Sequence, residues 1–395
     1  MPEIDLSNYQ NREQAYVKHS LLRSYLPDLI YKISTTWDAL IFVDGFAGPW
    51  QTRDPEFSDS SFSVALQILR KCQEGLKAKG RDFGVGLIVV EDEPESYERL
   101  EQFATARTEL RCPVHPIRGK FIKRIPRINQ LIQQTARNTF RFILLDPTGW
   151  ADIPMGELKS FVKGRSSEVL INLMTKHIVR FLDEGNRAES YRKLFGRDGV
   201  LDELRKIPKE ERADVAVREY CRSLKQLCAF EYVSSAVILE PTREQIKYFL
   251  VYASNHPRGV EVFKAAENKV SKIQDDLRHQ IELRGQTELF DAMETASPLV
   301  RRLHRQYSDQ ARRKVIEKLL AEPLGAEISY ASVFCEGMAF PLVTPNDLVE
   351  WLRALEPNIQ IRLDGERRRK PSATRLDRVV VLNREYLLSE LSRGN

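Results

Sequence analysis

The sequence predicts an α/β protein with a doubly wound, mostly parallel sheet, followed by a smaller helical domain that carries a hairpin. In the first half of the 395 residues, short apolar runs alternate with amphipathic stretches. This alternation is typical of parallel sheets whose crossovers are helices. Several of the apolar runs end in an acid. From Pro298 onward the pattern changes to amphipathic stretches followed by two short strands around a basic segment.

The elements of the first half follow in order along the chain. Apolar residues at helical spacing predict a first helix over 11–37, with Pro27 as a kink or break. A buried strand then ends at Val43. Further helices are predicted over 61–78, 94–107, 125–137 and 154–165, and further strands over 84–93, 112–121, 140–150 and 167–174. Such a succession favours right-handed crossovers that place helices on both faces of the sheet.

The last strands of the sheet are expected to form an antiparallel hairpin. Residues 176–230 are charged and predict a helical insertion. Two strands follow between 230 and 254, joined by a short polar turn. That connection is too short for a parallel crossover, so the two strands must pair antiparallel. The first domain is therefore predicted to span 1–265.

The C-terminal part predicts a winged helix-turn-helix domain over 298–395, after a linker or irregular helical segment over 266–297. Helices are expected over 308–325, 329–338 and 344–356, the last with Thr344 as its cap. Two strands over 358–365 and 378–383 then enclose a basic wing tip. Its cations, which could contact nucleic-acid phosphates, are Arg367, Arg368, Arg369 and Lys370.

Three acids stand at the ends of predicted strands: Asp44, Glu91 and Asp146. In a doubly wound sheet the carboxyl ends of the strands line one crevice, where ligands bind. We therefore expect the three acids to share a site. The alternative is that each acid only caps the helix that follows it.

The turns after these strands narrow the choice of ligand. The stretch IFVDGFAGPW (residues 41–50) has neither the phosphate-loop pattern nor the full dinucleotide fingerprint, which disfavours an NAD-dependent oxidoreductase. Glu91 occupies a position where carboxylates bind ribose hydroxyls. In DPTGW, which begins at Asp146, the aromatic Trp150 offers a stacking face for a planar base.

These motifs resemble a known family. IFVDGFAGPW resembles motif I of S-adenosylmethionine-dependent methyltransferases, and DPTGW resembles their motif IV. Together with the helix that contains Lys18 and His19, and with SSEVLINL, YFLVYASNHPRG and the C-terminal domain, the chain resembles the three-Cys-motif partner protein (TcmP) family. The resemblance implies a Rossmann-like methyltransferase sheet with an antiparallel last hairpin and a winged helix. It also implies a bacterial protein with a three-cysteine-motif protein as its partner.

Carried over residue by residue, the resemblance assigns roles to the three strand ends. It places Asp44, Gly45, Phe46, Ala47 and Gly48 around the methionine part of S-adenosylmethionine, and Glu91 with Asp92 at the ribose. It makes Asp146, Pro147 and Trp150 the catalytic set, which holds and stacks on a target base. Trp50 and Lys120 depart from the family pattern.

The composition limits the class of protein and its cellular compartment. With 42% hydrophobic and 30% charged residues and a net charge of +5, the chain is an ordinary globular protein that is mildly basic. Five scattered cysteines form no metal-ligand pattern, and no signal peptide or membrane span is visible, which favours the cytoplasm. We expect a methyltransferase acting on an exocyclic amino group of a nucleic-acid base. The alternative is a non-catalytic adaptor that binds DNA or the three-cysteine partner.

Overall fold

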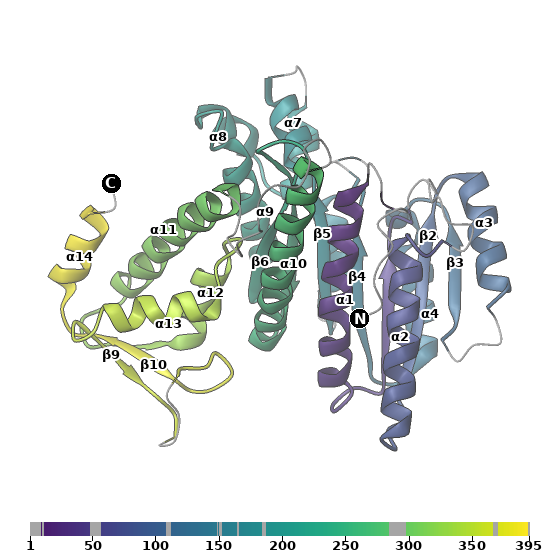
Figure 1. Cartoon of the computed structure of the whole chain (residues 1–395), viewed down its shortest axis with the longest axis horizontal. Coiled ribbons are helices and arrows are strands. Elements are labelled where there is room, and N and C mark those ends of the chain that lie inside the picture. The colour runs from purple at the N-terminus through teal and green to yellow at the C-terminus, as the bar shows by residue number, and fades with distance from the viewer. Residues whose placement is uncertain are drawn as a thin grey trace. The chain divides into compact units, whose positions relative to one another are not determined.

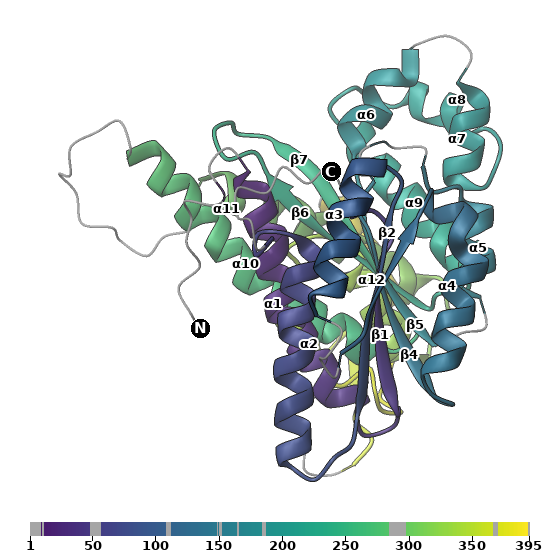
Figure 2. The ribbon, with the colours of Figure 1, turned by 90° about the vertical axis from the view of Figure 1, so that its right-hand side faces the viewer.

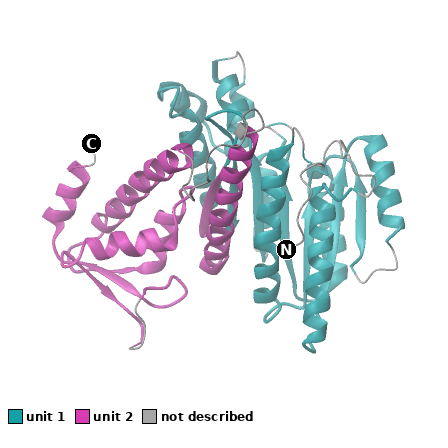
Figure 3. Cartoon of the chain, viewed as in Figure 1, with its two compact units in different colours: residues 1–230, 238–253 teal, residues 231–237, 254–395 magenta. Residues whose placement is uncertain are grey.

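The structure is a computed structural model of the whole chain, shown in Figure 1. It describes residue 9 and residues 12–47, 57–107, 112–147, 149, 152–163, 166–183, 187–283, 298–365 and 370–393. The chain folds into two compact units, one of residues 1–230 and 238–253 and one of residues 231–237 and 254–395 (Figure 3).

A seven-stranded sheet with strand order β3-β2-β1-β4-β5-β7-β6 organises the first part of the chain. Its strands are β1 (Ala39–Asp44), β2 (Gly84–Glu91), β3 (Val114–Arg118), β4 (Thr139–Leu145), β5 (Ser167–Leu173), β6 (Tyr232–Leu239) and β7 (Ile246–Ser254). Strands β1 to β5 pair in parallel, whereas β7 runs antiparallel to β5. The predicted mixed α/β class with a mostly parallel sheet is confirmed.

Helices cover both faces of this sheet (Figure 2). They are α1 (Glu13–Ile33), α2 (Ser61–Ala78), α3 (Pro94–Thr105), α4 (Phe121–Thr135) and α5 (Met155–Val162). Helices α1 to α3 lie on one side of the sheet, and α4 and α5 on the other. Helix α1 continues through Pro27, where the sequence predicted a kink or break. Helix α2 begins at a serine cap, since the Ser60 hydroxyl accepts a hydrogen bond from Ser63 N at 3.2 Å.

The segment predicted as a helical insertion is indeed helical. It contains α6 (Thr175–Arg180), the short 3-10 helix η2 (Phe181–Asp183), α7 (Ala188–Phe195), α8 (Val200–Lys206) and α9 (Arg212–Cys228). One side of α9 is buried and carries aromatic and aliphatic side chains, among them Tyr220 and Leu224. Helix α9 packs mainly against α5, so the insertion extends the apolar core on that face of the sheet.

The second unit combines helices with a small antiparallel sheet of order β8-β10-β9. Its elements are α10 (Pro257–Leu283), α11 (Pro298–Leu320), β8 (Glu327–Ser329), α12 (Tyr330–Met338), α13 (Pro345–Ala354), β9 (Ile359–Arg362), β10 (Arg378–Val381) and α14 (Arg384–Arg393). Residues 266–283 belong to α10, where the sequence predicted a linker or an irregular helical segment. Thr344 caps α13 as predicted and forms a capping box with Asp347.

Candidate active site

The three predicted acids lie at the carboxyl ends of three neighbouring parallel strands. Asp44 ends β1, which lies between β2 and β4, and its backbone is paired with Val89 and Leu144. Glu91 and Asp146 each stand two residues beyond those pairing partners. Asp44 and Asp146 therefore flank the position where the strand order reverses, which is where doubly wound sheets bind their ligands.

Asp44 is completely buried, with 0% of its surface exposed. Its carboxyl group accepts hydrogen bonds from Ser61 Oγ at 2.6 Å and from Phe46 N at 3.2 Å. Burial raises the pKa of Asp44 to about 7, although Ser61, Lys18 and the Phe46 amide each act to lower it. A cationic group brought against this carboxyl would therefore stabilise its ionised form.

The turn after β1 is held close to the neighbouring strands. Gly45 N donates to Leu144 O at 2.9 Å, and Ala47 N donates to Val90 O at 3.0 Å. A Cβ atom at Gly45 would lie 2.6 Å from a methyl carbon of Leu145, so a larger residue requires that neighbour to shift. Gly48, the last of the predicted motif I residues, lies outside the described residues.

Glu91 and Asp92 differ in their surroundings. Glu91 is 7% exposed, and its Oε1 accepts a hydrogen bond from Glu93 N at 2.8 Å. Asp92 is exposed to solvent in the turn that follows. Of this predicted pair, Glu91 is thus the one buried at the strand ends beside Asp44.

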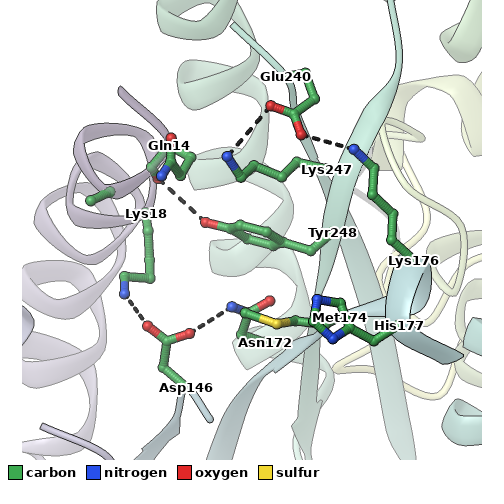
Figure 4. Close-up of a pocket in the computed structure, with 11 residues that line it drawn as sticks. Gln14, Lys18, Asp146, Asn172, Met174, Lys176, His177, Glu240, Lys247 and Tyr248 are labelled. Carbon is green, nitrogen blue, oxygen red and sulfur yellow. Dashed lines mark hydrogen bonds and ion pairs between the residues drawn. The ribbon is translucent and has the colours of Figure 1, made fainter. Parts of the chain in front are cut away.

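Both carboxylate oxygens of Asp146 are bound by neighbouring side chains. Lys18 of α1 forms an ion pair with its Oδ2, and Asn172 Nδ2 of β5 donates to its Oδ1 at 2.6 Å (Figure 4). The side chains of Lys18 and Asp146 are only 11% and 20% exposed. Pro147 is buried directly after Asp146, whereas Trp150 lies outside the described residues. The carboxylate is thereby fixed in one orientation.

A cavity of about 360 Å³ opens beside Asp146. It is lined by Gln14, Ala15, Lys18, Asp146, Asn172, Met174, Lys176, His177, Glu240, Lys247 and Tyr248 (Figure 4). Its volume is within the range of small-molecule sites. Asp146, Asn172 and Lys18 thus form one wall of a space that a planar ring could enter.

The opposite wall comes from α6, the turn between β6 and β7, and β7. Glu240 binds Lys176 at 2.8 Å and Lys247 at 3.4 Å. Although burial opposes the effect, these two lysines lower the pKa of Glu240. Tyr248 donates to Gln14 O at 3.4 Å, and burial together with the charges of two acids raises its pKa well above 10, so it remains a neutral donor.

Sequence reasoning missed part of this site. Lys18 was only a marginal candidate, because it lies in the helix that matches the family's first helix, and Asn172 was not singled out. The one signal for Asn172 is a polar residue near the end of the otherwise apolar strand VLINL. His19 lies elsewhere, since it is buried and hydrogen-bonded through Nδ1 to the Tyr9 hydroxyl at 3.0 Å.

The predicted wing tip is only partly described. Arg367, Arg368 and Arg369 lie outside the described residues. Lys370 is exposed and donates to Asn346 Oδ1 at 3.2 Å. Within the described ranges, His, Cys, Asp and Glu form no cluster suited to a metal ion, and no helix has the length and apolar character needed to cross a membrane.

Comparison with known proteins gives little more. No protein-family model and no curated protein matches the chain. Among solved structures, it is similar to a loganic acid methyltransferase with SAH, over 71% of this chain and 90% of that chain, with 9% sequence identity and a TM-score of 0.29. A score this low supports no conclusion about fold or function.

Proposed function

We propose that this chain is an S-adenosylmethionine-dependent methyltransferase that acts on an exocyclic amino group of a nucleic-acid base. The observation that supports it most is the set of three acids at adjacent strand ends, with Asp146 fixed beside the cavity by Lys18 and Asn172. The antiparallel β7 between β5 and β6 is also the arrangement expected of a methyltransferase sheet.

The residues at the first two strand ends suit the cofactor. S-Adenosylmethionine supplies an electrophilic methyl group, and it carries an ammonium group and a ribose. The buried Asp44 would bind the ammonium, with Gly45, Phe46 and Ala47 around the methionine part, because that carboxyl lacks a direct cationic partner among the described residues. Glu91 would bind the ribose hydroxyls.

At the third strand end, Asp146 would act by positioning. Its carboxylate would accept a hydrogen bond from the amino group that receives the methyl group. This bond would direct the nitrogen toward the methyl carbon, with Pro147 supporting the backbone. Transfer would form the N–C bond as the S–C bond of the sulfonium breaks, and the methylated nitrogen would then lose a proton to solvent, so a strong general base is not required. Lys18 holds the carboxylate in place during this step.

The second unit would supply the nucleic-acid contact. Its helices α11 to α13 followed by the β9–β10 hairpin are in the order of a winged helix-turn-helix. The exposed Lys370 stands at the edge of the basic tip. With the ordered sequence motifs, this supports membership of the TcmP family and a three-cysteine-motif protein as partner.

A specific observation favours a second function, that of a non-catalytic adaptor. Lys18 already places an ammonium group on Asp146, where the acceptor amino group would bind. Lys120, at the start of α4, is exposed where the family commonly has an acid that contacts adenine. In that case the fold recruits DNA or the partner protein without methyl transfer.

Calorimetric titration of the full chain with S-adenosylmethionine tests whether the chain binds this cofactor. We expect micromolar binding that Asp44→Ala abolishes and Asp146→Ala retains. Both variants should lose transfer of a labelled methyl group to genomic DNA or total RNA. A folded wild-type chain that binds no S-adenosylmethionine would favour the adaptor, and transfer that survives in Asp146→Ala would remove that residue from the mechanism.

A further inference from the structure

The two ends of the Asn172 carboxamide have different surroundings. Nδ2 donates to Asp146 Oδ1 at 2.6 Å. Because a carboxylate only accepts, this bond fixes which end of the amide faces Asp146. Oδ1 is buried and has no hydrogen-bond partner in the part of the chain that the structure describes.

Such an oxygen can accept one more hydrogen bond. Asn172 is only 4% exposed, and it lines the cavity beside Asp146 (Figure 4). Buried acceptors are nearly always satisfied, since leaving one unpaired costs free energy. Asp146 and Asn172 lie side by side in the lining of the cavity, and each carries an oxygen that can accept a hydrogen bond.

The charges in the cavity limit the kind of donor. Lys18, Lys176 and Lys247 supply three positive charges, and Asp146 and Glu240 supply two negative ones. An ammonium group, such as that of a lysine side chain, would add to this positive excess. A neutral planar amino group brings two N–H donors and no charge, so it matches the two acceptors without repulsion.

We propose that Asn172 is a specificity-determining residue of this site: its Oδ1 accepts one N–H of the neutral amino group of the acceptor base, and Asp146 accepts the other. This assignment rests on the proposed function and deepens it, because it selects an aromatic amino group over an aliphatic amine. A site built in this way rejects analogues that lack the amino group, since its buried acceptors would remain unpaired.

Binding of matched nucleosides to the full chain tests the assignment. The probes are 2′-deoxyadenosine with its analogue lacking the amino group, purine 2′-deoxyribonucleoside, and 2′-deoxycytidine with its analogue lacking the amino group, 2-pyrimidinone 2′-deoxyribonucleoside. Each is titrated by NMR or calorimetry with and without S-adenosylmethionine. We expect the wild type to prefer the amino member of at least one pair by at least about tenfold, and Asn172→Leu to reduce that preference by about tenfold.

A matched control separates recognition from structural support. Asn138→Leu makes the same substitution just before β4, at the end of that strand opposite Asp146, where Asn138 Nδ2 donates to Thr36 O at 2.9 Å and the residue does not line the cavity; it should leave the preference unchanged. If Asn172→Leu weakens both members of a pair equally, the residue only supports Asp146 and the assignment is overturned. A wild type that binds S-adenosylmethionine but shows no preference also overturns it, while the cofactor site stands. Failure to bind S-adenosylmethionine, by contrast, counts against the proposed function, and the nucleoside preference is still measured without it.

Discussion

Asp44→Asn should change how the stability of the protein depends on pH. The carboxyl is fully buried and its pKa is raised from 3.8 to about 7, first by burial. Between these two values the folded chain keeps a proton that the unfolded chain has released, so stability falls as the pH rises. Each pH unit corresponds to about 1.4 kcal/mol, which makes the total loss roughly 4 kcal/mol by about pH 8.

Asparagine is close to Asp44 in shape and remains neutral. Its oxygen can accept from Phe46 N and its amide nitrogen can donate to Ser61 Oγ, so both contacts persist. Urea unfolding of both proteins from about pH 5 to about pH 8 is the assay. The free energy of unfolding of Asp44→Asn, relative to that of the wild type, should increase with pH by about 1.4 kcal/mol per unit up to pH 7.

A second variant checks the cause. Ser61→Ala removes a hydrogen bond that lowers the pKa of Asp44, so the decline in wild-type stability should extend to higher pH. Parallel pH profiles for the wild type and Asp44→Asn would refute the reasoning, because they would mean that Asp44 is ionised in the folded protein throughout this range.

Three further substitutions test packing and ion pairs, each by chemical denaturation at neutral pH. Lys18→Met leaves the half-buried Asp146 carboxylate without its cation and should lower the free energy of unfolding by about 1–3 kcal/mol; no change would mean that the ion pair contributes nothing. Gly45→Ala places a Cβ 2.6 Å from a leucine methyl and should cost about 1–3 kcal/mol, whereas a neutral effect would show that the turn can shift. Glu267 of α10 forms a buried ion pair with Lys264 at 2.8 Å; Glu267→Gln removes this carboxylate and should cost about 3–5 kcal/mol, and a second change, Lys264→Met, should restore most of it if the loss of the counter-charge is the cause.

The sequence predicts the sheet well because each of its strands and helices has a recognisable pattern within a few consecutive residues. An apolar run that ends in an acid, as at Val43 and Asp44, indicates both a strand and its carboxyl end, and this places three acids at one edge. The short connection between β6 and β7 also predicts that these two strands pair antiparallel.

The partners of these acids depend on contacts that no local pattern encodes. Lys18 lies 128 positions before Asp146 in the chain, and nothing in its helix distinguishes it from a surface lysine. Asn172 is hidden as one polar residue in a buried strand, and its role emerges only from the contact with Asp146. Pro27 shows the opposite failure. Proline predicts a break in the helix, but α1 continues through it, with neighbours such as Leu26 buried.

The long separation between Lys18 and Asp146 also bears on how the protein folds. Closing a loop of 128 residues costs conformational entropy before any contact repays it. During synthesis from the N-terminus, α1 must wait for β4 and then for Asn172 on β5 before the three side chains can meet. The three side chains can therefore meet only after residue 172 has been synthesised, so this wall of the cavity depends on contacts that no segment shorter than 155 residues contains.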